Sequence, residues 1–247
     1  MDSEDKSSRG FFSSLLPRRG NGSQKGAFAA SEEWAAAERR AMVERQLRRR
    51  GIRDERVLDA MGELPRHEFV PPEFLSQAYE DHPLPIGGGQ TISQPYMVAA
   101  MLEALELKGT ERVLEVGTGS GYEAALLARL AAHVYTIEYD PELARTAKER
   151  LSGMGLGDPV EVIEGDGSLG YPPAAPFDGI LVAAGAPDIP ACFFEQLVEG
   201  GRLVIPVGDR DSQELRQIRK CEGKPIVRHL GYCRFVPLLG AHGWEEF

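Results

Sequence analysis

Between residues 109 and 207, short apolar runs alternate with longer stretches whose apolar residues recur at helical spacing. We expect strands at residues 113–116, 134–137, 160–163, 180–182 and 203–207. We expect helices at residues 121–131, 141–152 and 189–197. Buried strands that alternate with helices predict a mostly parallel sheet with helices on both faces.

The last part of the chain has a different pattern. Two long strand-like runs, residues 214–221 and 226–237, flank the turn sequence EGKP at residues 222–225. This pattern predicts an antiparallel hairpin. The expected fold class is therefore α/β: a doubly wound, seven-stranded, mostly parallel, Rossmann-like sheet that ends in an antiparallel hairpin. This is the arrangement of class I methyltransferases.

Residues 1–28 are rich in Ser, Gly, Arg and Lys without periodicity, and they predict a disordered N-terminal tail. Residues 29–247 then predict a single domain. Within it, residues 29–108 form N-terminal helices and a substrate loop, and residues 109–247 form the cofactor-binding sheet and the hairpin.

The N-terminal helices have recognisable start and stop signals. Ser31 opens a helix that runs to Arg50 and stops at Gly51. Three more helices are expected at residues 54–61, 71–79 and 96–107. The prolines of residues 64–72 predict extended or turning backbone between them.

The segment RVLEVGTGSGY, residues 112–122, joins a predicted strand to a predicted helix through three glycines. Glycine lets the backbone turn sharply and approach a ligand closely. The spacing is Gly-x-Gly-x-Gly, which differs from the dinucleotide fingerprint, and no Gly-Lys-Ser/Thr follows. The loop therefore favours S-adenosylmethionine, a cofactor without phosphate, and a tight turn without a ligand is the alternative. Its candidate cofactor residues are Gly117, Thr118, Gly119 and Gly121.

Three acidic residues lie at or near predicted strand ends, where open α/β sheets bind ligands. Glu138 lies about twenty residues beyond the first glycine, where an acid can reach ribose hydroxyls. Asp166 could orient an adenine amino group or a backbone amide. Glu115 could brace the glycine loop by accepting backbone N–H bonds, and its contact with the cofactor is less direct. Each acid could also simply meet solvent at the end of its strand.

The segment at residues 79–95 is dense in Gly and Pro and precedes a predicted helix. The N-terminus of that helix would attract an anion. Ser93 is placed either to cap the helix or to donate a hydrogen bond to a substrate carboxylate. On the local pattern alone, the capping role is favoured, since serine is common at that position.

At these residues the chain resembles the protein-L-isoaspartate O-methyltransferase family, over about residues 42–239. The matching segments are LPIG at 84–87, TISQP at 91–95, LEVGTGSGY at 114–122, GDG at 165–167 and RFVPL at 234–238. The resemblance implies S-adenosylmethionine as methyl donor. It also implies that the enzyme methylates the α-carboxylate of L-isoaspartyl residues in damaged proteins and peptides, which begins their repair.

The resemblance also implies roles for individual residues. Ser93 matches the active-site serine, and Val236 matches a residue whose backbone contacts the isoaspartyl peptide. Further residues are expected to bind the cofactor (Gln90, Thr91, Ile92, Tyr139, Gly167) or, with Ser93 and Val236, the substrate (Ile86). Two residues depart from the family pattern: Gly88, which should loosen the substrate loop, and Glu123, where a neutral side chain is expected.

Charge and composition argue against several classes of binding partner. The 247 residues carry a formal net charge of −10, the wrong sign for a nucleic-acid footprint. No apolar run is long enough to span a membrane. The three cysteines are widely spaced, and no metal-ligand spacing occurs. We therefore expect a cytoplasmic protein, a monomer, without a metal, a nucleic-acid partner or a membrane partner.

Three other readings stay open. The chain could be a class I methyltransferase for a small molecule or another protein. It could be a non-catalytic, cofactor-binding adaptor. A nicotinamide dehydrogenase is disfavoured by the glycine spacing and the terminal hairpin.

Overall fold

A computed structural model describes residues 31–245 of the chain. The predicted disordered tail, residues 1–28, lies outside the described residues. The strands are β1 Leu84–Gly87, β2 Gln90–Ile92, β3 Arg112–Val116, β4 His133–Glu138, β5 Val160–Glu164, β6 Phe177–Val182, β7 Leu197–Gly208, β8 Gln213–Cys221 and β9 Lys224–Cys233. The α-helices are α1 Glu32–Met42, α2 Glu55–Glu63, α3 Pro95–Leu105, α4 Tyr122–Leu130, α5 Pro141–Gly153 and α6 Ala191–Glu195.

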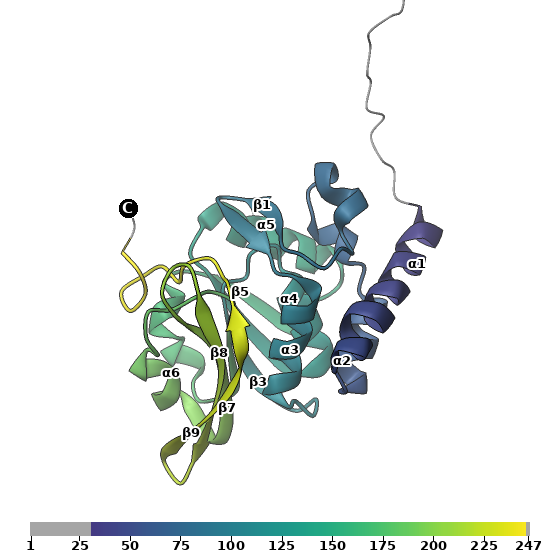
Figure 1. Ribbon diagram of the computed structural model, residues 1–247. Helices are drawn as coiled ribbons and strands as arrows, with labels where there is room; N and C mark the ends of the chain where they lie inside the picture. The colour runs from purple at the N-terminus through teal and green to yellow at the C-terminus, as the bar shows by residue number, and fades with distance from the viewer. Residues whose placement is uncertain (1–30, 246–247) are drawn as a thin grey trace, which may run out of the picture.

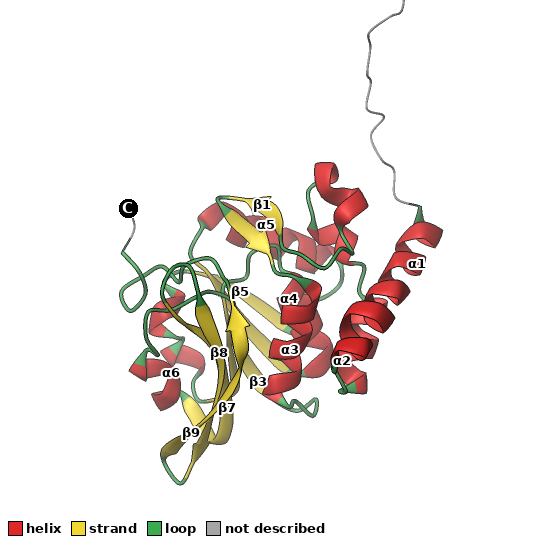
Figure 2. Ribbon diagram, viewed as in Figure 1, coloured by secondary structure: helices red, strands yellow, loops and turns green. Residues whose placement is uncertain are grey.

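Seven of the strands form one sheet in the order β5-β4-β3-β6-β7-β8-β9 (Figure 1). The pairs from β5 to β7 are parallel, whereas β7–β8 and β8–β9 are antiparallel. Helices α1 to α4 lie on one side of this sheet and α6 on the other (Figure 2). The predicted doubly wound, mostly parallel sheet with an antiparallel end is thus confirmed. The strand order reverses at β3, which lies between β4 and β6, and this is where such sheets bind ligands.

The terminal hairpin is shorter than predicted. Its second strand, β9, ends at Cys233, so residues 234–237 do not continue the ladder. The Phe235 N–H donates instead to the side-chain oxygen of Gln213, at 2.8 Å. The chain then crosses to the end of β6, where Gly185 N donates to Val236 O and Leu238 N donates to Gly185 O. This departure carries Val236 from the sheet edge to the ligand-binding end of the sheet.

The N-terminal helix follows its predicted signals. Ser31 caps α1 by accepting a hydrogen bond from Trp34 N, and the helical path continues through a π turn and a 3-10 turn to Arg50. Gly51 ends it in the left-handed conformation at φ 105°. The α3 helix ends at Leu105, two residues earlier than predicted, because Glu106 also adopts a left-handed conformation.

Two connecting segments form 3-10 turns. Residues 66–69, expected to be extended or turning, form a 3-10 turn, and the short helix expected at residues 71–79 is a 3-10 helix at residues 72–77. Residues 84–92 form the small antiparallel β1–β2 hairpin, which the sequence pattern did not predict. Its turn contains Gly87, Gly88 and Gly89, all at positive φ. Gly88, expected to loosen this loop, has φ 57°, a backbone conformation that other residues rarely adopt.

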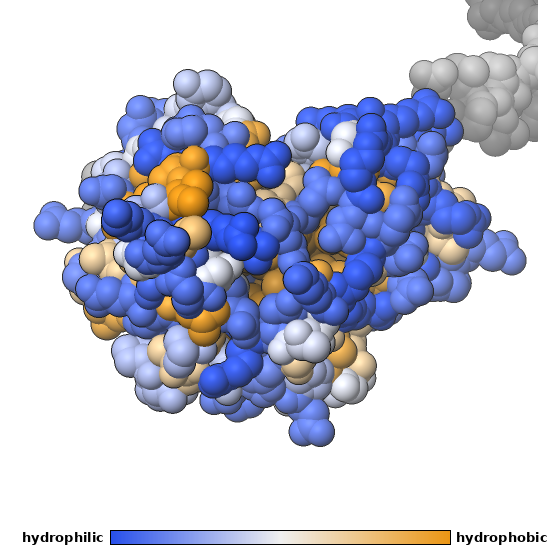
Figure 3. Space-filling view, turned by 90° about the horizontal axis from the view of Figure 1, so that it is seen from below, coloured by the Kyte–Doolittle hydropathy of each residue, from blue (hydrophilic) through white to orange (hydrophobic). Residues whose placement is uncertain are grey.

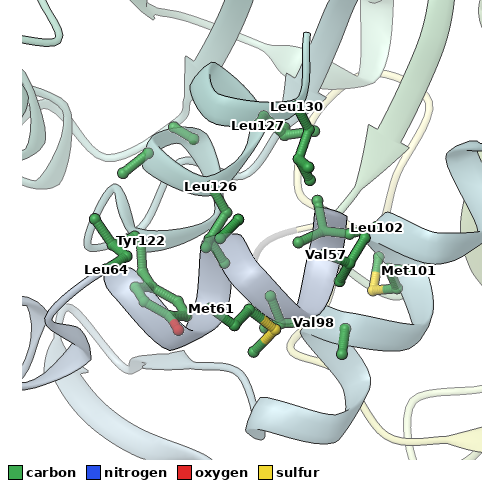
Figure 4. Packing of buried hydrophobic residues seen from close by; sticks show 14 of the residues in the cluster. Val57, Met61, Leu64, Val98, Met101, Leu102, Tyr122, Leu126, Leu127 and Leu130 are labelled. Carbon is green, nitrogen blue, oxygen red and sulfur yellow. The ribbon is translucent and has the colours of Figure 1, made fainter. Parts of the chain in front are cut away.

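Two hydrophobic clusters hold the layers together, one on each side of the sheet. The larger joins the N-terminal helices to the sheet. In it Val57 and Met61 of α2 pack against Val98 and Leu102 of α3 and against Leu126 of α4 (Figure 4). Seen from below, the surface is largely hydrophilic, with small separate hydrophobic patches (Figure 3). Within residues 31–245, no helix is both long enough and apolar enough to cross a membrane.

Candidate active site

A cavity that is partly open to solvent lies where the carboxyl ends of β3, β4 and β6 meet. Most of the candidate residues from the sequence line it: Gln90, Thr91, Ile92, Ser93, Gly117, Thr118, Gly119, Glu138, Tyr139, Gly167 and Val236. Four candidates do not line it: Ile86, Glu115, Gly121 and Asp166. We refer to this cavity as the donor pocket.

The glycines of the loop after β3 have two different tasks. Gly117 and Gly119 line the donor pocket at φ 98° and 53°. A Cβ on Gly119 would lie 3.2 Å from Cδ1 of Ile86, so the β1–β2 hairpin covers the loop closely. Gly121 has φ 87°, and a Cβ there would lie 3.3 Å from Leu151 of α5. Gly121 therefore allows helix packing, and Ile86 lies against the glycine loop.

Glu138 fixes the shape of the loop from the end of β4. One carboxylate oxygen accepts a hydrogen bond from Gly119 N at 2.7 Å, and the other accepts from Asp140 N at 3.0 Å. The side chain is buried and lines the donor pocket. Glu138 is thus placed to meet a polar group of a ligand while it holds the loop.

Glu115 does not brace the loop in the expected way. Its side chain is 0% exposed, and it accepts a short hydrogen bond from the Thr136 hydroxyl, not from a backbone N–H. Thr136 in turn shares a 2.6 Å hydrogen bond with the Thr118 hydroxyl. The cause is the strand pleat, which places Glu115 beside Thr136 of β4 and inside the sheet layer. Glu115 supports the loop through two threonines and stays behind the donor pocket.

Glu123 lies beside this buried group, and it lines the donor pocket. Its side chain is 7% exposed, and its Oε1 has no hydrogen-bond partner within the described chain. Burial raises the pKa of Glu123 to about 8. Burial and then the nearby charge of Glu123 raise the pKa of Glu115 well above its usual range. Two acids that would repel one another are therefore favoured in their neutral form.

Asp166 takes the second of its two predicted roles, the orientation of a backbone amide. One carboxylate oxygen accepts from Ser168 N, and the other accepts from Ala241 N at 2.8 Å. Burial raises the pKa of Asp166, but the hydrogen bonds from the Ser168 hydroxyl, Ala241 N and Ser168 N together outweigh burial and lower it. A Cβ on Gly240 would lie 1.9 Å from the carboxylate, so the C-terminal loop rests directly on Asp166.

A second cleft opens beside the donor pocket, between the β2–α3 connection and residues 232–237. Ser93 lies at its boundary, and Gln94, not Ser93, occupies the N-cap position of α3. The predicted capping role is therefore wrong, and Ser93 lines the donor pocket and the second cleft instead. Five residues line both cavities: Thr91, Ser93, Ala183, Val236 and Pro237. The two cavities therefore adjoin at these residues.

The structure adds lining residues that the sequence analysis missed. Ala183 and Ala184 follow β6 directly, so the strand-end argument used for the acids would have found them. Leu238 and Leu239 come from the C-terminal loop, which Trp244 fastens by donating to Gly185 O at 3.0 Å. That loop reaches the donor pocket only through contacts between segments distant in sequence, so no local sequence pattern predicts its position.

Comparison with known proteins agrees with this geometry. The family model for Protein-L-isoaspartate(D-aspartate) O-methyltransferase matches residues 37–243. The chain belongs to this family. A protein-L-isoaspartate O-methyltransferase of Methanoculleus marisnigri is 55% identical over 208 residues, which cover 84% of this chain and 94% of the relative. A relative of that name from Koribacter versatilis is 55% identical over 210 residues, covering 85% and 94%.

Solved structures of the family share the fold. A protein-L-isoaspartate O-methyltransferase superposes with a TM-score of 0.72 at 30% identity, covering 83% of this chain and 66% of that chain. A putative family member from Plasmodium falciparum, solved in complex with S-adenosyl-L-homocysteine, also gives 0.72, at 28% identity. That match covers 81% of this chain and 98% of the other.

Proposed function

We propose that this chain transfers the methyl group of S-adenosylmethionine to the α-carboxylate of L-isoaspartyl residues in damaged proteins and peptides, which begins their repair. Membership of the family supports the reaction. The single observation that carries the proposal is the position of Ser93, at the junction of the donor pocket and the second cleft.

The donor pocket fits S-adenosylmethionine. Gly117 and Gly119 line it with backbone at positive φ, which other residues rarely adopt, and Glu138 presents a carboxylate there. Gln90, Thr91, Ile92, Thr118, Tyr139 and Gly167 would complete the contacts. Asp166 would act from behind, through Ser168 and the C-terminal loop. When bound, the cofactor supplies an electrophilic methyl group on a sulfonium.

The acceptor needs no general base. A carboxyl group with a reference pKa near 4 is already ionised at neutral pH. The protein therefore has to orient the carboxylate and exclude water, and orientation alone can lower a barrier by roughly 7–11 kcal/mol. Ser93 would hold one carboxylate oxygen while the other faces the methyl group. The backbone of Val236, on the opposite wall, would hold the peptide.

A pair of isomeric peptides tests the function. With radiolabelled S-adenosylmethionine, the purified protein should label an L-isoaspartyl peptide and leave the matched aspartyl peptide unlabelled. Equal labelling of both would favour another methyl acceptor, and labelling of neither would favour a binding adaptor. In either case the proposal would be wrong.

We also infer that the protein acts as a cytoplasmic monomer on isoaspartyl proteins and peptides, without nucleic acid or membrane. The three cysteines are free, as is usual in reducing compartments. Light scattering after size exclusion should give a mass near 27.1 kDa, and a dimer would contradict the first inference.

A further inference from the structure

Arg66 is a buried arginine whose role the proposed reaction does not explain. It opens the 3-10 turn at residues 66–69, and its side chain is 0% exposed. Burial lowers the pKa of the guanidinium, and the ionisable groups that oppose this effect are two tyrosines, Tyr122 and Tyr79. A buried cation is costly unless hydrogen bonds satisfy it. The position of Arg66 therefore calls for a specific reason.

Arg66 joins two separate segments of backbone. Its Nε donates to Ala78 O at 2.8 Å, and its Nη2 donates to Ser93 O at 2.8 Å. The second bond holds the carbonyl of the residue proposed to orient the acceptor carboxylate. The β1–β2 hairpin, which leads into Ser93, is thus tied at its end to the protein interior.

The same side chain connects to the donor pocket. Its guanidinium lies 4.9 Å from the ring centroid of Tyr122, the first residue of α4 and part of the pocket wall. Tyr122 packs edge-on against Phe69 at 5.3 Å, and Arg150 lies over the other side of this pair, 5.7 Å from the Phe69 ring. Arg150 donates to Ser120 O at 2.6 Å, inside the glycine loop. Arg150 thus holds the glycine loop and Arg66 holds Ser93, and the rings of Phe69 and Tyr122 connect the two arginines.

We propose that Arg66 is a positioning residue that sets Ser93 in register with the glycine loop, so that acceptor and donor meet in line. This inference rests on the proposed function. A planar guanidinium can donate to two carbonyls in a fixed geometry while it stacks on a ring. A lysine ammonium at the same place keeps the charge and has no planar fork with which to hold both carbonyls.

The first test compares Arg66→Lys with Arg56→Lys. Arg56 also joins two backbone carbonyls, Leu107 O at 2.6 Å and Leu130 O at 2.9 Å, and neither residue lines the donor pocket or the second cleft. Both variants should lower the melting temperature. Only Arg66→Lys should lower kcat/KM for an isoaspartyl peptide, by about 10-fold or more, because small misplacements of reacting groups are costly. The Kd for S-adenosyl-L-homocysteine, measured by calorimetry, should stay within about 2-fold of wild type in both.

A double-mutant cycle separates positioning from general stability. If Arg66 acts through Ser93, Arg66→Lys should lower kcat/KM by less than about 2-fold once Ser93 is alanine. A purely structural role would give additive losses in the two backgrounds. Additive losses, or equal losses of kcat/KM in Arg66→Lys and Arg56→Lys, would overturn the proposal.

A measurement on the wild-type chain covers the case in which Arg66→Lys does not fold. A crystal structure with S-adenosyl-L-homocysteine and an isoaspartyl peptide should retain the Arg66–Ser93 hydrogen bond, with the peptide carboxylate at Ser93. Loss of that bond would overturn the role of Arg66 and leave the methyltransferase function intact. Failure of the wild type to label the isoaspartyl peptide would instead reject the proposed function, so the two failures are distinguishable.

Discussion

The donor half and the acceptor half of the site are built in different ways. The donor pocket rests on the ends of β3, β4 and β6, whose positions follow from strand pairing. The acceptor cleft is lined by segments far apart in sequence, mainly within residues 83–97, 210–211 and 232–237. Single side chains hold those loops by bonding to backbone groups: Arg66 at Ser93 and Gln213 at Phe235.

This difference indicates how each half should respond to change. Strand pairing in a parallel sheet positions many groups of the donor half at once. We therefore expect the donor half to lose cofactor binding only when a larger side chain fills the donor pocket. The acceptor half depends on a few side chains, so it should lose alignment when one of them is shortened. Four substitutions test this contrast, from the largest expected effect on function to the smallest.

The largest effect is expected for Gly119→Val in the donor half. Position 119 has φ 53°, and a Cβ there already meets Ile86 at 3.2 Å. Strain and overpacking together should weaken binding of S-adenosyl-L-homocysteine by about 100-fold or more, as measured by calorimetry. Gly155→Val is the control, since Gly155 has φ 75° and open space around it. Equal affinity losses in both variants would contradict the prediction.

Ser93→Ala should follow, in the acceptor half. Loss of the hydroxyl should lower kcat for the isoaspartyl peptide by about 10- to 100-fold, because the carboxylate loses an orienting donor. Affinity for S-adenosyl-L-homocysteine should remain near that of wild type. Ser76→Ala, on an exposed residue of the 72–77 turn, serves as the control. A fall in cofactor affinity would assign Ser93 to the donor half instead.

Gln213→Met should have a moderate effect on the acceptor half alone. Gln213 is buried, and its side-chain oxygen accepts the Phe235 N–H that positions Val236. Loss of this bond should raise KM for the peptide by roughly 5-fold, since a buried N–H loses its partner. The matched control is Gln217→Met on the same strand, where the buried amide donates to Ala104 O away from both cavities. A similar KM for the peptide in the two variants would contradict this prediction.

The smallest effect on function is expected for Glu123→Gln. Burial raises the pKa of Glu123 to about 8, so the acid is neutral near pH 7 and glutamine resembles it. The unfolded chain ionises this acid above about pH 4.3, whereas the folded chain keeps the proton up to about pH 8. Glu123 therefore destabilises the fold increasingly as pH rises from about 4.3 to about 8.

The glutamine variant should remove that penalty. Relative to wild type, its melting temperature should rise between pH 5 and pH 8 by about 5 °C. Scanning calorimetry at the two pH values checks this, with Glu149→Gln on the exposed face of α5 as control. If the melting temperatures of the variant and the wild type differ by the same amount at both pH values, Glu123 is ionised in the folded protein and the prediction is wrong.

The sequence predicted the donor half better than the acceptor half, for a physical reason. Glycine spacing and apolar runs are local, so they located Gly117, Gly119 and Glu138 at the pocket. The backbone N–H partners expected for Glu115 were wrong, because strand pleat and cross-strand pairing point its side chain at Thr136. Arg66 and the C-terminal loop depend on contacts between distant segments, and local patterns carry little information about them. For Ser93 the local pattern favoured a helix cap, which was wrong because Gln94 occupies the N-cap position of α3. The role of Ser93 in orienting the acceptor comes from the family motif and stays a prediction.

Strand β9 has a consequence outside the site. It is the last strand of the sheet, almost fully exposed, and it carries Ile226, Val227 and Tyr232 at the surface. An open, apolar edge invites pairing with foreign extended chains. Pro225, the surface charges of Lys224 and Arg228, and the register irregularity at Leu215 all act against such pairing. An enzyme proposed to handle damaged, partly unfolded clients would thereby avoid becoming a template for their aggregation.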